Sequence, residues 1–103
     1  MSIVVIARLF PNPGQTAELL AALEAAAPAI HAEPGCELYA GHEAPDGTIV
    51  MIEKWSTQAD LDGHLAGEPV KVYRDARAPY EAQRPQLEVL VPRSYGDAER
   101  GAL

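Results

Sequence analysis

The chain has 103 residues, of which 48% are hydrophobic, so its size and composition fit one small folded domain. Its net charge is −7, with 15 acidic and 8 basic residues and no basic cluster, which disfavours a nucleic-acid partner. No apolar run approaches the roughly 20 residues that span a bilayer, and no signal region precedes the first strand, so we expect no membrane partner. Cys36 is the only cysteine, which excludes an internal disulfide and indicates a reducing, cytoplasmic location.

The first third of the chain reads as a strand followed by a helix. Residues 2–10 form a continuous β-branched and apolar run, which is typical of a strand covered on both faces. Pro and Gly at 11–14 end this strand. Residues 15–31 place leucine, alanine and isoleucine at spacings of three and four, which predicts an amphipathic helix. The Glu33-Pro34-Gly35 segment ends it.

Two further strands follow as a hairpin. Residues 36–43 alternate in polarity, and the Ala44-Pro45-Asp46-Gly47 segment is a strong turn signal. Residues 49–55 carry large side chains on both faces and end at Trp55. We therefore expect residues 36–43 and 49–55 to pair as antiparallel strands.

A short helix is predicted directly after Trp55. Ser56 or Thr57 offers a hydroxyl to the free amides of the first turn, and Asp60 lies three residues after Thr57, as in an acidic variant of the capping box. From about residue 58 onward, His64 shares one helical face with two leucines. The pattern leaves two interpretations open, a half-buried histidine that is hydrogen-bonded to a neighbour or a ring that exchanges protons near neutral pH.

The remaining elements complete a recognisable order. Residues 66–69 interrupt the helical region, residues 70–80 look helical, and residues 86–91 form a last strand. The order β-α-β-β-α-β predicts an α+β, ferredoxin-like fold, with a four-stranded antiparallel sheet and helices on one face. Because the other face is also apolar, we expect a two-fold homodimer. Residues 1–92 form the expected domain, and 93–103 form a loose tail or an arm on a neighbour.

Several segments together resemble the antibiotic biosynthesis monooxygenase (ABM) family of dimeric α+β barrels. They are a Pro13-Gly14 helix entry, the Glu33-Pro34-Gly35-Cys36 turn, Glu53-Lys54-Trp55, and the helix from Thr57 to His64. They occur in family order over residues 2–91, which is nearly the whole chain. The resemblance implies the dimeric barrel more specifically than it implies any one reaction.

The resemblance also implies a monooxygenase that oxidises a phenolic or quinol-type aromatic with dioxygen and needs no metal, flavin or haem. The sequence agrees in having no glycine-rich phosphate loop and no set of residues at metal-ligand spacing. His64 is the candidate base or anion-stabilising donor, and Arg8 could pair with a phenolate or form a salt bridge at the dimer edge. Trp55, Tyr39 and Tyr73 are candidates for lining the substrate cavity, or are core residues.

The sequence leaves further interpretations open. Glu53 is expected to be a structural ion-pair partner and only secondarily an acid, and His42 is expected to be exposed. The related haem-degrading branch uses an asparagine, a tryptophan and a haem-ligating histidine where this chain has Ala7, His64 and Arg74, so haem degradation is disfavoured. A non-catalytic barrel that binds a small hydrophobic ligand is one alternative. An isomerase or cyclase of the same fold is another.

Overall fold

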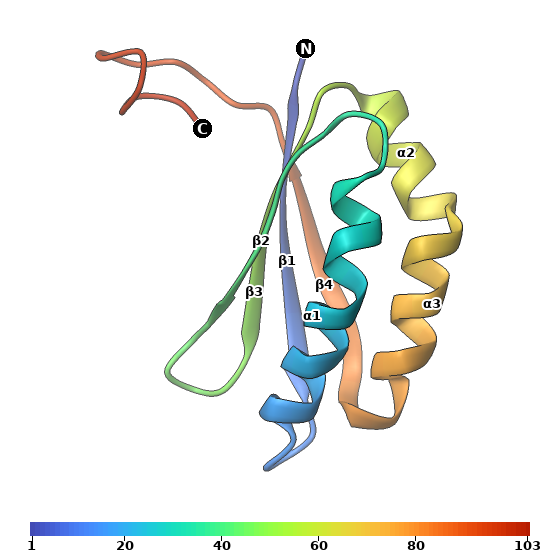
Figure 1. Cartoon of the computed structure of the whole chain (residues 1–103). Helices are drawn as coiled ribbons and strands as arrows, with labels where there is room; N and C mark the ends of the chain where they lie inside the picture. Colours follow the sequence, from blue (N-terminus) through green and yellow to red (C-terminus); the bar gives the residue numbers. More distant parts are fainter.

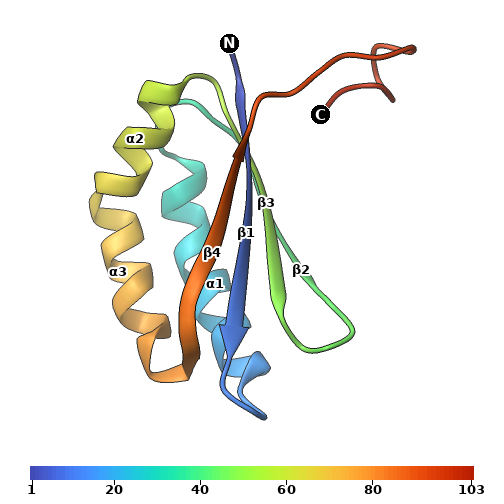
Figure 2. The same cartoon turned by 180° about the vertical axis from the view of Figure 1, so that it is seen from behind.

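Four antiparallel strands form one sheet, and all of the helices lie on one of its faces (Figures 1 and 2). The computed structural model describes residues 1–103. Its elements are β1 (Ile3–Pro11), α1 (Thr16–His31), β2 (Cys36–Glu43), β3 (Ile49–Trp55), α2 (Gln58–Ala66), α3 (Glu68–Arg77), a 3₁₀ turn (Ala78–Tyr80) and β4 (Glu81–Leu90). The strand order is β2-β3-β1-β4, which confirms the predicted ferredoxin-like fold.

The predicted element boundaries hold except in the last third of the chain. The strands β2 and β3 have the predicted bounds. The helix α3 begins at Glu68, two residues earlier than predicted, because Pro69 is tolerated in the first turn of a helix. It ends at Arg77, two residues before Pro79, instead of continuing to Tyr80. The strand β4 begins at Glu81, five residues earlier than the alternation alone predicted. Pro85 argues locally against a strand over these residues, because proline has no backbone N–H to donate. However, β4 is an edge strand, where the missing N–H is tolerated.

The start of α2 is fixed by contacts on both sides. The Asp60 amide donates to Thr57 Oγ1 at 3.1 Å, and Thr57 Oγ1 donates to Asp60 Oδ2 at 3.0 Å, so the predicted cap is confirmed. Gly35 adopts φ of +76° next to this cap, and a Cβ placed there would lie 2.2 Å from Asp60 Oδ2. The turn after α1 and the start of α2 therefore fit together only with a glycine at this position.

The hydrophobic core lies between the sheet and the helices. Alternate residues of β1 and β3 point toward the helices, where they meet Leu19, Leu23 and Ile30 of α1. The strand β4 is different, because Leu87 and Val89 are 55% and 53% exposed. No helix covers this edge strand closely, which leaves room for a cavity beside it.

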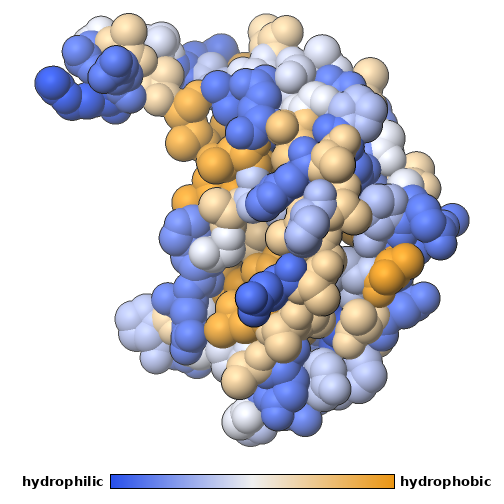
Figure 3. Space-filling view, in the orientation of Figure 1, coloured by the Kyte–Doolittle hydropathy of each residue, from blue (hydrophilic) through white to orange (hydrophobic).

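The helix-free face of the sheet is also apolar. Ile6 of β1 and Ala40 of β2 both pair with Ile52 of β3, and all three are only partly buried in the single chain. Figure 3 shows apolar atoms gathered on a hollowed side of the molecule, between the C-terminal tail and the β2–β3 hairpin. No helix has the length and hydrophobicity that crossing a membrane would require.

Candidate active site

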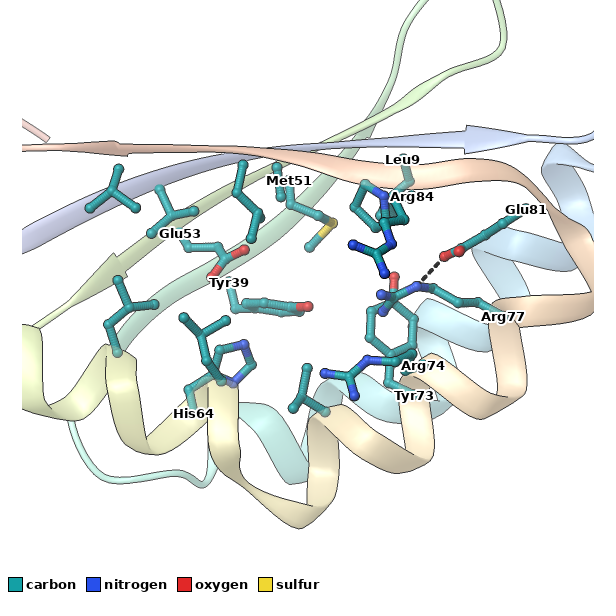
Figure 4. Close-up of a pocket in the computed structure, with 18 residues that line it drawn as sticks. Leu9, Tyr39, Met51, Glu53, His64, Tyr73, Arg74, Arg77, Glu81 and Arg84 are labelled. Atoms are coloured by element: carbon teal, nitrogen blue, oxygen red, sulfur yellow. Dashed lines mark hydrogen bonds and ion pairs between the residues drawn. The ribbon is translucent and has the colours of Figure 1, made fainter.

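A cavity of about 490 Å³ lies between the sheet and the helices α2 and α3 (Figure 4). All four strands contribute to its walls, as do both of these helices. Most of the lining is apolar, with a few titratable and polar side chains among it. Cavities of this size and character are typical of sites for small organic molecules.

His64 projects from α2 into this cavity and is held by three neighbours. Its Nδ1 lies 2.9 Å from Glu33 Oε1, and its ring stacks on Trp55 with the centroids 4.5 Å apart. The ring of Tyr39 meets it edge-on at 5.7 Å. Only 3% of His64 is exposed. A carboxylate at Nδ1 accepts a hydrogen bond, so of the two neutral tautomers it favours the one with its proton on Nδ1, in which Nε2 is a lone-pair acceptor.

Glu53 of β3 is a second titratable group in the same wall. Its carboxylate is buried and accepts a 3.0 Å hydrogen bond from Trp55 Nε1, but it forms no ion pair, so the ion pair expected from the sequence is wrong. The structure instead pairs this carboxylate with a neutral indole from its own strand. Burial raises the pKa of Glu53 above its usual value, despite the indole and the nearby His64.

Two tyrosine side chains line the cavity and offer their hydroxyl groups as hydrogen-bond donors. The ring of Tyr39 extends from β2 into the centre of the cavity, with its hydroxyl directed toward the α3–β4 end (Figure 4). Burial raises the pKa of Tyr39 far above its usual value, so its hydroxyl stays protonated. Burial also raises the pKa of Tyr73 to about 12. The buried hydroxyl of Tyr73 has no hydrogen-bond partner.

Three guanidinium groups lie at the other end of the cavity. Arg74 and Arg77 come from α3, and Arg84 comes from β4 (Figure 4). Arg77 is buried, pairs with Glu81, and places its guanidinium 4.5 Å from the ring centroid of Tyr73. The cavity therefore has a carboxylate and a histidine at one end and guanidinium groups at the other.

The structure brings together three of the five residues proposed from the sequence. His64, Tyr39 and Tyr73 all line the cavity. Trp55 lies behind His64, fully buried, and supports the site without lining it. Arg8 lies on the helix-free face of the sheet, where its guanidinium donates to Thr48 Oγ1 at 2.8 Å. This position gives no support to a role for Arg8 in the cavity, because alternate residues of a strand point to opposite faces.

The sequence alone did not predict several other residues of the site. Glu33 lies 31 positions before His64 in the turn after α1, and only the packing of that turn on α2 brings the two together. Arg84 lies in a segment for which the sequence pattern predicts neither a helix nor a strand. Arg77 carried a usable signal, since it shares a helical face with Val70 and Tyr73. His42 is exposed, as predicted.

Comparison with known proteins gives a consistent result. The family model described as "Antibiotic biosynthesis monooxygenase" matches residues 2–76. The chain is 34% identical over 73 residues to the "Putative monooxygenase Rv0793" of Mycobacterium tuberculosis, covering 70% of this chain and 72% of that protein. The solved structure of Rv0793 matches with a TM-score of 0.83 at 28% identity, over 94% of this chain and 100% of that one. A Caulobacter crescentus structure, described as a "putative antibiotic biosynthesis monooxygenase", matches with a TM-score of 0.80 at 26% identity, over 86% and 87% of the two chains.

Proposed function

We propose that this chain, which belongs to the antibiotic biosynthesis monooxygenase family, oxidises a phenolic or quinol-type aromatic with dioxygen and without a metal, flavin or haem. One observation carries the proposal. A histidine with a carboxylate partner and a permanently protonated tyrosine hydroxyl share one apolar-walled cavity. These groups are what proton removal from a phenol and stabilisation of the resulting anion require.

His64 is the proposed general base, with Glu33 as its positioning residue. A proton on Nδ1 that is shared with the Glu33 carboxylate leaves Nε2 free to accept the substrate proton. The same carboxylate stabilises the imidazolium that this transfer creates. Both side chains are largely buried, at 3% and 12% exposure, so solvent screens their interaction weakly.

Tyr39 is the proposed donor to the anionic oxygen of the substrate. Its hydroxyl keeps its proton over the working pH range, because burial raises its pKa. The bound anion can then transfer one electron to dioxygen, and the resulting radical pair can combine through a new carbon–oxygen bond. The peroxide anion takes back the proton held by His64 and becomes a hydroperoxide. Loss of water from this hydroperoxide, which takes the remaining hydrogen of the same carbon, breaks the O–O bond and leaves a carbonyl. The reacting carbon, a CH₂ group in the keto tautomer of the substrate, thus becomes C=O while dioxygen supplies that oxygen and the oxygen of one water, so no external reductant is needed.

The working unit is proposed to be a homodimer formed through the helix-free face. The partly buried Ile6, Ala40 and Ile52 lie at the centre of this face, where a second sheet would cover them. Residues 1–92 are the proposed domain, and 93–103 are the proposed arm. In Figures 1 and 2 the tail leaves the body beyond β4, and the Leu103 carbonyl accepts a 2.7 Å hydrogen bond from Lys54 Nζ.

The test of the proposed function is oxygen uptake by the purified, metal-stripped protein with a panel of hydroquinones, naphthols and anthrones. With an active substrate, we expect His64→Ala to lower kcat by about 10²- to 10⁴-fold, the range for loss of a general base. Asp62→Ala is the matched control, because Asp62 is exposed on the same helix, α2, outside the cavity. Turnover of His64→Ala within threefold of the parent would refute the role of the base. Tight binding of these aromatics without any oxygen uptake would leave a ligand-binding protein instead.

A further inference from the structure

We infer that the substrate carries a carboxylate, and that Arg74 and Arg84 bind this group at the α3–β4 end of the cavity. The inference rests on the proposed function for the identity of the cavity as the active site. It adds a substrate class, an aromatic acid in place of any phenol or quinol. It also fixes the direction in which such a molecule lies.

The charge of the cavity is opposite to that of the protein. The chain carries −7 overall, yet three of its eight basic residues line this one cavity, against two of its fifteen acidic residues. One of those two acids, Glu81, is neutralised by Arg77. The other, Glu53, lies at the far end and has a raised pKa. An anionic ligand is therefore drawn to the cavity in an otherwise acidic protein.

Arg74 and Arg84 are the two cavity cations whose guanidinium groups have no partner within the chain. Neither takes part in an ion pair or a side-chain hydrogen bond within the chain, whereas Arg77 is committed to Glu81 and to the ring of Tyr73. Arg84 reaches into the cavity from the sheet side and Arg74 approaches from the helix side (Figure 4). A planar carboxylate between them could accept paired N–H bonds from both, which a guanidinium fork suits better than an ammonium group.

A third group at the same end lacks an acceptor. Tyr73 is only 2% exposed, and its buried hydroxyl has no hydrogen-bond partner. Figure 4 shows this hydroxyl directed from α3 toward the sheet, beside Arg84. A buried polar group without a partner is uncommon and unfavourable, and an oxygen-rich ligand at this end would supply the missing acceptor.

The two ends of the cavity favour different chemical groups on a bound substrate. His64 and Glu53 line the end that removes a proton, and the guanidinium groups line the end that prefers negative charge (Figure 4). The Tyr39 ring lies between the two ends. Met51 also lies between the two ends (Figure 4), and most of the remaining lining is apolar. A fused aromatic ring system with a phenolic hydroxyl at one end and a carboxylate at the other satisfies all three regions at once.

The experiment compares ligands that differ only at the acidic end. Isothermal titration calorimetry with the whole 103-residue chain measures the Kd of 6-hydroxy-2-naphthoate, its methyl ester and 2-naphthol. We expect the acid to bind at least tenfold more tightly than either neutral compound, and more weakly as salt is added. Equal or weaker binding of the acid overturns the inference, as does the absence of measurable binding of the acid at millimolar concentration.

Substitutions then test where the carboxylate binds. Arg74→Gln and Arg84→Gln should each weaken binding of the acid by about tenfold, and the double variant should bind the acid no better than the ester. Binding of 2-naphthol should stay within about threefold. Arg93→Gln is the matched control, since Arg93 is an exposed arginine outside this cavity. A preference for the acid that survives in the double variant overturns the assignment.

Failure of this inference and failure of the proposed function give different results. The calorimetry involves no turnover, so a preference for the acid that depends on Arg74 and Arg84, with no oxygen uptake from any hydroxyarene, refutes the oxygenase alone. Oxygen uptake that is indifferent to the carboxylate and to both substitutions refutes the inference alone. Circular dichroism and the thermal midpoint of each variant confirm that the fold is retained.

Discussion

The contact between Glu33 and His64 gives a prediction that needs no substrate. A hydrogen bond to a charged group contributes about 1.5–3 kcal/mol, and both side chains are too buried for solvent to weaken it much. At about 1.4 kcal/mol for each factor of ten, this corresponds to a roughly 10- to 150-fold preference for the tautomer with its proton on Nδ1. We therefore expect neutral His64 to be almost entirely in this form.

A series of variants at position 33 grades the effect. Glu33→Gln keeps an acceptor oxygen but loses the charge, so the contribution should fall to that of a neutral hydrogen bond, about 0.5–1.5 kcal/mol, or a roughly 2- to 10-fold preference. Glu33→Ala removes the acceptor and leaves a buried imidazole nitrogen unpaired, which should destabilise the fold by about 1–3 kcal/mol. The preference for Nδ1 should be lost in this variant.

Long-range ¹⁵N–¹H correlation spectra of histidine-labelled protein, recorded at the alkaline end of a pH titration, measure the tautomer directly. His31 and His42 serve as internal controls, because their ring nitrogens contact the Tyr39 and Val50 carbonyls and not position 33. Parent protein with the His64 proton on Nε2 would refute the proposed orientation of the base. An unchanged His64 tautomer in Glu33→Ala would refute the role of Glu33.

Three further outcomes are expected. Gly35→Ala should lower the free energy of unfolding by about 2–3 kcal/mol in urea titrations, and Gly14→Ala by only about 1 kcal/mol. Both glycines have φ of +76°, but only Gly35 faces Asp60. Equal losses would contradict this. Burial raises the pKa of Glu53, so its carboxyl contributes stability at low pH that is lost as pH rises through the folded-state pKa. Glu53→Gln should therefore gain stability relative to the parent as pH rises above the ordinary glutamate pKa. A difference that does not depend on pH would count against this. Ile52→Glu should convert a dimer into a monomer in sedimentation velocity. Val72→Glu should not, because Val72 is exposed on α3, on the opposite side of the sheet from the helix-free face. A monomeric parent at micromolar concentration would rule out the proposed assembly.

The sequence was most informative where local rules and packing agree. The alternation in β2 and β3, the turn between them and the Thr57 cap each follow from a few neighbouring residues, and each was predicted at the right position. It was least informative for β4, where Pro85 argues locally against a strand and only the position of β4 at the sheet edge makes it acceptable.

The candidate site was predicted in part for the same reason. His64 was detectable because it shares a helical face with apolar residues, and its burial is a local consequence of that face. Glu33 and Arg84 contribute through contacts between segments far apart in the chain, which no local pattern encodes. Arg8 was selected as the one charge in an apolar strand, but the alternation of β1 directs it to the face opposite the cavity.

The exposed inner side of β4 has a consequence for how members of this family can diverge. Leu87 and Val89 form a wall of the cavity but belong to no tightly packed interior, so exchanging them alters the shape of the binding space at little thermodynamic cost. Arg84 lies on the same strand. Mutation of this one edge strand can thus explore new substrates while the opposite wall, with His64 on its tryptophan support, stays intact. Selection for a different aromatic compound, in nature or in a directed-evolution library, should therefore accumulate changes first at 84, 87 and 89.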